Sequence, residues 1–167
     1  MARDGFSLPP QTISLGDLMR LKRELIALDD FIHQSELRSL GHALKTPPKA
    51  STALNNYAAL NHLNFLHAED RQKGIDFLDH LSVHAPRAHI SFAIEPSAPT
   101  IRKIAGWFRD NIDPLLLLNT GIEPSIAVGF TLNTDNHYHD FSLRQHFSKQ
   151  RDLLIEAIAK SDEAKRS

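Results

Sequence analysis

The sequence contains no cysteine, which excludes a disulfide framework, a thiolate nucleophile and a zinc site with cysteine ligands. Purely apolar runs are no longer than Leu115–Leu118, far short of the roughly 20 residues that a helix needs to cross a bilayer. An excess of charge is also missing, because the formal net charge is −1 with histidine neutral. No overall field therefore draws the chain onto nucleic acid or an anionic membrane. We expect no nucleic-acid partner, and membrane contact only through another protein.

Glycine is scarce as well, and the seven glycines are scattered along the chain. Neither the P-loop pattern, nor GxGxxG, nor GxSxG occurs. Acidic pairs such as Asp29-Asp30 and Asp76/Asp79 fall on predicted helices, where a solvated face is a simpler interpretation than a general acid–base pair. The sequence thus predicts a protein without catalytic residues or a cofactor, one that acts through contacts with other proteins.

Ten histidines are the residues most suggestive of chemistry. His137, His139 and His146 lie close together in the sequence, and His137 and His139 share one face of a predicted strand. These two imidazoles, with Asp140 close by, could hold a metal such as zinc. His80 and His84 form an i, i+4 pair on a predicted helix, a spacing that also allows chelation. The sequence places no further ligand for either group. Solvent-exposed histidines are therefore the preferred interpretation, and no metal site is assigned.

The first half of the chain has helical periodicity. Ser14-Leu-Gly-Asp17 resembles a capping box, so we expect a helix from Ser14 that ends before Pro47-Pro48. Its apolar residues recur with a 3-4-3-4 spacing, which is typical of a coiled-coil-like seam. The seam consists of Leu18, Leu21, Leu25, Leu28 and Ile32.

A second helical stretch is expected from Ser51, which is a good N-cap residue. The polar residues Glu69–Lys73, followed by Gly74, predict a break or kink, and a short helix then closes before Pro86. The sequence therefore predicts a helical N-terminal region over residues 1–86, folded as a hairpin or a small bundle.

Beyond residue 86 the pattern changes to short apolar or alternating runs, which predict strands. A β-α-β-β-β-α order is expected for a small C-terminal domain, residues 87–167, with a frayed polar tail. Its elements are a strand at His89–Glu95, a helix at Ser97–Ile112, strands at Leu115–Leu118, from Pro124 and at His137–Phe141, and a last helix from Ser142. The predicted fold class of the whole chain is α+β.

The segment from Glu123 to Phe147 resembles the C-terminal signature of the delta subunit of F-type ATP synthases. In that family an acidic residue, proline and serine lead to a glycine pair and an apolar strand, and Asp-x-Ser-x-Arg then opens the last helix. The matching positions are Pro124, Ser125, Gly129, Asp140, Ser142 and Arg144. The resemblance covers about residues 89–158. Val128 replaces the first glycine of the pair, and the helical region is shorter than the family's six-helix bundle.

Architectural roles are expected for the matched residues. Gly129 on a strand suggests a bulge or a close backbone approach. Asp140 and Ser142 are candidate helix caps, and Arg144 could pair with an acid or bind a carbonyl. None of these roles involves catalysis.

The resemblance implies a peripheral-stalk connector that ties the catalytic head to the stator during proton-driven ATP synthesis. It implies the alpha subunit and the stator b subunit as partners, and a peripheral location at the cytoplasmic face of the cell membrane. The seam of the first helix and the apolar face of the last helix are candidate partner surfaces, with internal core as the alternative for both. The second face consists of Leu143, Phe147, Leu154 and Ile158.

Two other functions remain open at this point. A stator-like subunit of another rotary or secretion ATPase would also combine a long helix with a small α/β head. A small metal-binding, histidine-based enzyme is the third hypothesis, and it rests on the histidine groups alone.

Overall fold

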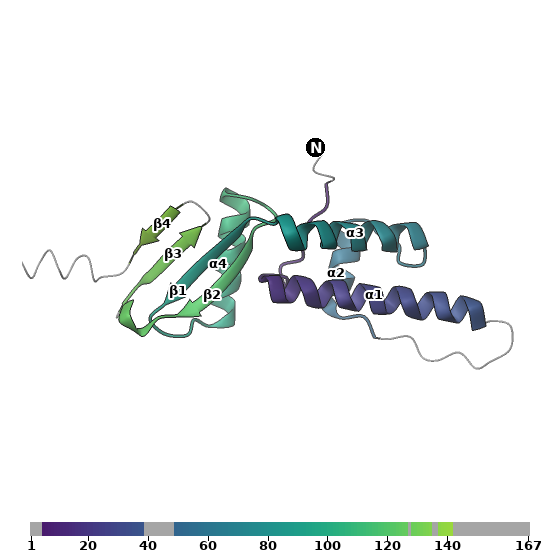
Figure 1. Cartoon of the computed structure of the whole chain (residues 1–167), viewed down its shortest axis with the longest axis horizontal. Coiled ribbons are helices and arrows are strands. Elements are labelled where there is room, and N and C mark those ends of the chain that lie inside the picture. The colour runs from purple at the N-terminus through teal and green to yellow at the C-terminus, as the bar shows by residue number, and fades with distance from the viewer. Residues whose placement is uncertain (1–4, 39–48, 127, 135–136, 142–167) are drawn as a thin grey trace, which may run out of the picture. The chain divides into compact units, whose positions relative to one another are not determined.

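The structure is a computed structural model of the 167-residue chain, and it describes residues 5–38, 49–126, 128–134 and 137–141. Within these ranges, three helices occupy the N-terminal half, and a fourth helix and one mixed four-stranded sheet follow (Figure 1). The elements in chain order are α1 (Leu15–Arg38), α2 (Thr52–Leu60), α3 (Ala68–His84), β1 (Arg87–Phe92), α4 (Ala98–Asn111), β2 (Leu117–Ile122), the 3-10 helix η1 (Pro124–Ile126), β3 (Phe130–Thr134) and β4 (His137–Asp140). The predicted α+β fold class is confirmed.

Contacts divide these residues into two compact units. The first contains residues up to 87 together with residues 98–119. The second contains residues 88–97 together with those from 120 onward. The division that the sequence predicts after residue 86 stays a prediction.

The capping box at the start of α1 is formed. The Ser14 hydroxyl accepts a hydrogen bond from the Asp17 amide at 3.2 Å, and the Asp17 carboxylate accepts one from the Ser14 amide at 3.0 Å. Two amides that have no helical partner are thereby satisfied. At α2, the Ser51 side chain accepts a hydrogen bond from the Leu54 amide at 3.1 Å. Both helix starts that the sequence predicts at these serines are confirmed.

The predicted break before Gly74 is wrong, because α3 runs without interruption from Ala68 to His84. Gly74 lies where α3 packs closely against its neighbours: a Cβ added there would lie 3.1 Å from Cδ2 of Leu25 and 3.4 Å from the Tyr57 ring. The Gly74 carbonyl also accepts a hydrogen bond from the Tyr57 hydroxyl at 3.1 Å. The glycine therefore permits close packing of the helix and does not end it.

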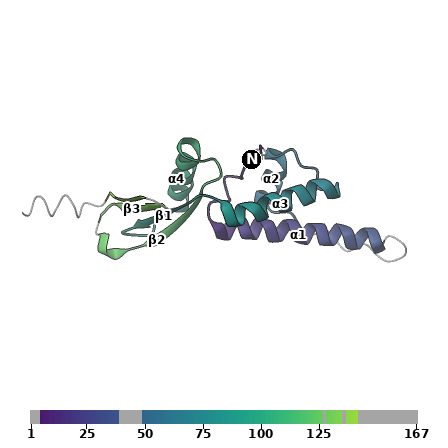
Figure 2. The same ribbon diagram turned by 45° about the horizontal axis from the view of Figure 1, so that its top comes forward.

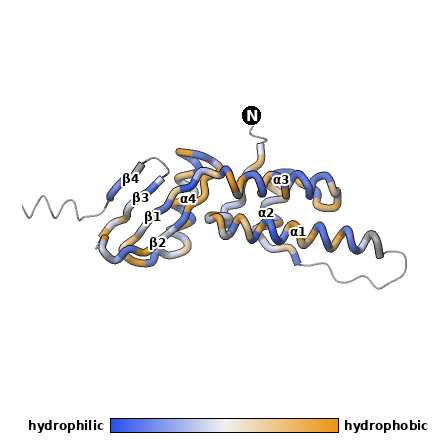
Figure 3. Tube along the Cα trace, viewed as in Figure 1, coloured by the Kyte–Doolittle hydropathy of each residue, from blue (hydrophilic) through white to orange (hydrophobic). Residues whose placement is uncertain are grey.

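The core of the first unit lies between α1, α2 and α3 and includes one residue of β2. Helices α1 and α3 lie side by side in both ribbon views (Figures 1 and 2). Apolar and polar residues alternate along both helices (Figure 3), as expected where only one face of each is buried. The buried members are Leu8, Leu18, Leu21, Leu25, Leu54, Tyr57, Leu78, Leu81, Ala85 and Leu117.

The sheet has the strand order β2-β1-β3-β4. Strands β1 and β3 pair antiparallel with Ile90 opposite Leu132 and Phe92 opposite Phe130, and β3 pairs antiparallel with β4. The predicted strand at Leu115–Leu118 is displaced, since β2 begins at Leu117. The amide of Leu115 donates to the Asp113 carboxylate at 2.9 Å, which keeps the start of that apolar run in a turn.

The strand predicted from Pro124 starts later than expected. Residues Pro124–Ile126 form η1, closed by a hydrogen bond from the Ile126 amide to the Glu123 carbonyl at 3.1 Å. Strand β3 then begins at Phe130. The predicted last helix lies outside the described residues. No helix in the described ranges is long and apolar enough to span a membrane.

Candidate functional site

The apolar seam of α1 lies mostly inside the first unit. Leu18, Leu21 and Leu25 are buried in the core, and Leu28 packs against it. Ile32 is half-buried further along the helix. Of the two alternatives that the sequence left open for this seam, the structure places the three buried leucines in the core, so their side chains are not exposed to a partner.

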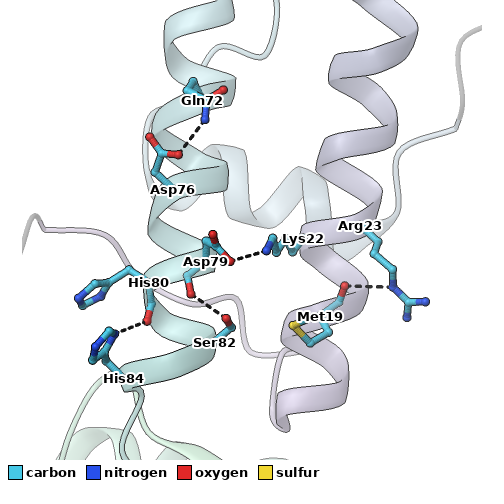
Figure 4. A network of polar contacts seen from close by, with 9 residues as sticks. All are labelled: Met19, Lys22, Arg23, Gln72, Asp76, Asp79, His80, Ser82 and His84. Carbon is cyan, nitrogen blue, oxygen red and sulfur yellow. Dashed lines mark hydrogen bonds and ion pairs between the residues drawn. The ribbon is translucent and has the colours of Figure 1, made fainter.

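Two ion pairs tie α1 to α3. Lys22 and Asp79 point toward each other across the two helices and form an ion pair near the surface (Figure 4). The second pair joins Asp29 of α1 to Arg71 of α3, and the Arg71 side chain is only 2% exposed. The acidic residues that the sequence suggested as a solvated face thus include two that hold the helices together.

Arg71 is also hydrogen-bonded to the backbone before α3. Its Nη1 donates to the carbonyl oxygens of Phe65 at 2.9 Å and of Leu66 at 3.1 Å. The guanidinium therefore compensates its burial with one carboxylate and two carbonyl acceptors. The polar composition around Arg71 gave no signal for this role, because only the packing shows which basic residue is buried.

A second arginine anchors the segment that precedes α1. Arg109 of α4 donates to the Leu116 carbonyl at 3.2 Å and to the Pro9 carbonyl at 3.4 Å, and it also bonds the Thr12 carbonyl. Burial lowers the pKa of Arg109 from its ordinary value. All three acceptors are backbone oxygens, so Arg109 holds α4 to the segment before α1 and to the residue before β2.

The acidic-Pro-Ser motif forms the turn between β2 and β3. Pro124 is the first residue of η1, and Ile126, its last residue, is buried. The Ser125 hydroxyl donates to the Glu123 carboxylate at 2.7 Å, and the Glu123 amide donates to the Phe92 carbonyl at 2.8 Å. The motif therefore fixes the path of the chain as it leaves β2.

The other motif residues fall partly outside the described residues. Gly129 has a φ of 106°, a backbone conformation that favours glycine. The path of the chain just before β3 therefore requires glycine at this position. Asp140 ends β4 opposite Thr131. Ser142 and Arg144 lie outside the described residues, as does the last-helix face of Leu143, Phe147, Leu154 and Ile158.

The two faces of the β1–β3–β4 sheet differ in chemistry. One side of the sheet carries four side chains with aromatic rings. We call this group the aromatic face: Phe92, Phe130, His139 and Phe141. Phe130 lies 6.2 Å from Phe92 and 5.0 Å from Phe141 between ring centroids, and His139 stacks on Phe141 at 6.0 Å. The strand register brings Phe130 beside the ring side chains of β1 and β4.

Among the described residues, the histidine groups do not form a metal site. His80 and His84 stack with ring centroids 4.3 Å apart, and Nδ1 of His84 donates to the His80 carbonyl at 3.0 Å (Figure 4). His139 is exposed on β4, and His146 lies outside the described residues. Over residues 5–38, 49–126, 128–134 and 137–141, no group of three or more histidine, aspartate or glutamate side chains could hold a metal ion.

The two ion pairs and the hydrogen bonds of Arg71 and Arg109 join segments that are distant in the sequence. No protein-family model matches the sequence, and no curated protein matches it significantly. The resemblance to ATP synthase delta subunits therefore stays a prediction that rests on the residues of the motif.

Proposed function

We propose that the chain is a delta-like peripheral-stalk connector of an F-type ATP synthase. It ties the catalytic head to the stator at the cytoplasmic face of the membrane, through the alpha subunit and the stator b subunit. It has no catalytic residue and no cofactor, since its task is to remain attached and stiff while the rotor turns.

The observation that carries the proposal is the position of the motif within the second half of the chain. A strand, a helix and a strand lead to the Glu123-Pro-Ser turn, and the Gly129 backbone then enters a β-hairpin that ends at Asp140. This is the order in which the delta family uses its motif. Pro124, Ser125 and Gly129 each have a role in the path of the chain, which suits a motif that specifies a fold.

Stiffness between α1 and α3 also supports a connector. The Arg71 side chain of the Arg71–Asp29 pair is removed from water, and the buried leucines of α1 leave little freedom for the helices to slide. A stalk protein that resists torque needs such fixed elements. The same burial disfavours a stator-like role in which α1 would pair with another helix through its leucine seam.

Trp107 of α4 is a suitable contact residue for a partner, because it is 58% exposed and tryptophan is enriched among residues that dominate binding energy. Its ring packs edge-on against Phe108 at 5.3 Å, which holds it in place before binding. Val83 of α3 is also an exposed apolar side chain and serves as a matched control.

The test is purification of the tagged chain from native membranes with quantitative mass spectrometry. We expect the alpha and b subunits in near-stoichiometric amounts, and less of both with Trp107→Ser but not with Val83→Ser. Depletion of the chain should abolish proton-driven ATP synthesis while the detached head still hydrolyses ATP. Recovery of a secretion ATPase would favour the stator-like alternative, and a stoichiometric metal in the purified chain would favour the histidine-based enzyme. An intact, coupled synthase without this chain refutes the proposal.

A further inference from the structure

The exposed side of α4 carries a tryptophan between two charges of opposite sign. Trp107 is 58% exposed. Lys103 precedes it by four residues and Asp110 follows it by three, so these side chains share one side of the helix, and both charged residues are exposed. Lys103 and Asp110 are about 10 Å apart along the axis, too far to pair within the helix. Among the described residues, neither forms an ion pair with another side chain.

Gly106 provides a recess in the helix surface beside Trp107. A Cβ added to Gly106 would meet no atom within 4 Å, so the space next to it is open. A helix position without a side chain allows a bulky group from another molecule to approach the backbone closely. Trp107 and Gly106 therefore form a projection and a recess on neighbouring positions of α4.

The four positions are symmetric about the point between Gly106 and Trp107. If two copies of α4 pack antiparallel across a two-fold axis at this point, each residue lies at the level of the one equally far on the other side of the axis. Lys103 is then at the level of Asp110 of the second copy, and Gly106 is at the level of its Trp107. Each of these contacts occurs twice, as in any interface in which the same patch is used by both copies.

We propose that α4 is the interface of a homodimer, in which two copies pack antiparallel through this side of the helix. Each Trp107 ring fills the recess at Gly106 of the other copy, and each Lys103 pairs with Asp110 of the other copy. A second copy is the occupant because the surface is complementary to itself in both shape and charge. Trp107 lies at the centre of the contact, where tryptophan contributes most to binding energy.

The dimer should be weak. A contact centred on one helix belongs to the low end of interface sizes, so we expect a dissociation constant of roughly 10–100 μM. The inference does not rest on the proposed function, because it concerns the chain alone. A dimer of this kind and a synthase subunit that binds Trp107 would exclude each other, so the dimer would be a form of the free chain.

Sedimentation equilibrium of the purified full-length chain tests the inference. The wild type is expected to form a reversible dimer, and Trp107→Ser should raise the dissociation constant by about tenfold or more, because it removes the central ring. Val83→Ser is the matched control: it removes an apolar side chain that is 68% exposed on α3, and it should leave the constant unchanged. Trp107 is the only tryptophan of the chain, so its fluorescence should shift to shorter wavelength as the dimer forms.

A charge exchange tests the ion pairs and the antiparallel direction. Lys103→Asp would place two carboxylates at the same level and Asp110→Lys two cations, so each should weaken the dimer by about fivefold. The double variant Lys103→Asp/Asp110→Lys again opposes unlike charges and should recover the wild-type constant within about twofold. The exchange moves the acid toward the N-terminus of α4 and the base toward its C-terminus, which favours the helix, and circular dichroism checks that each variant keeps its fold.

Three results would overturn the inference. The first is a wild type that stays monomeric up to about ten times the expected dissociation constant, since the face then serves another molecule. The second is a dimer that Trp107→Ser does not weaken, and the third is a double variant that stays as weak as the single charge variants. The purified chain contains no synthase subunits, so none of these results depends on whether the chain binds the synthase.

Discussion

The ion pair between Arg71 and Asp29 should contribute more to stability than any surface pair, and double-mutant cycles can measure the difference. The Arg71 side chain is 2% exposed and that of Asp29 is 33% exposed. In the pair Lys22–Asp79, which also joins α1 to α3, the corresponding values are 19% and 64%. The two pairs connect the same helices and differ in their access to water.

The magnitude follows from what each substitution leaves behind. Arg71→Met removes the ion pair and leaves the Phe65 and Leu66 carbonyls without their donor, so we expect a loss of about 3–4 kcal/mol. Asp29→Ala leaves the buried guanidinium with its two carbonyl acceptors only. Because water still reaches the position of Asp29, its loss should be about 2 kcal/mol, below the range for a fully buried pair.

The interaction energy is the quantity to compare. The double variant Asp29→Ala/Arg71→Met should lose less than the sum of the single variants, by about 1.5–2 kcal/mol. The cycle through Lys22→Met and Asp79→Ala should give less than about 1 kcal/mol, as for exposed pairs. Urea unfolding at neutral pH, followed by circular dichroism, measures both. Equal coupling energies in the two cycles would refute the link between burial and strength that underlies this estimate.

Two further predictions concern residues that contact each other in the first unit. Burial raises the pKa of the Tyr57 phenol, so the folded chain keeps this proton when the unfolded chain releases it above about pH 10. The wild type should therefore lose about 1 kcal/mol relative to Tyr57→Phe between about pH 8 and pH 11 in chemical unfolding, and parallel pH profiles would contradict this assignment. Gly74→Ala should lower the free energy of unfolding by about 1 kcal/mol despite its better helix propensity, because the new Cβ would lie 3.1 Å from Leu25. Gly106→Ala on α4, where a Cβ meets nothing within 4 Å, should raise it by roughly 0.5–1 kcal/mol, and equal signs for the two glycines would contradict the packing reason.

Local chemistry predicted the starts of the helices well. Ser14 with Asp17, and Ser51 with the Leu54 amide, act within a single turn, so the sequence carries all the information that their hydrogen bonds need. The change from helical to strand patterns after residue 86 is also local, which explains why the α+β class was predictable.

Features that depend on distant residues were not predictable in the same way. Taken alone in the sequence, Gly74 indicates a helix break. Its role in making room for a neighbour depends on the contact with Leu25, which lies 49 positions earlier. Arg71 is one of several charged residues in a polar run, and its burial depends on Asp29 in another helix. Strand β2 starts later than the sequence predicts, because the Asp113 carboxylate accepts a hydrogen bond from the Leu115 amide in a turn. An interaction of this kind leaves no periodic pattern in the sequence.

The leucine seam of α1 illustrates why partner surfaces are harder to predict than elements. A 3-4-3-4 spacing places apolar residues on one side of a helix whether the other surface belongs to the same chain or to a different one. Only the fold distinguishes these cases, and here Leu18, Leu21 and Leu25 face α2 and α3 in the core. The same ambiguity applies to the apolar side of the last predicted helix. The contacts of a connector should therefore be sought on exposed side chains such as Trp107, which the core does not use.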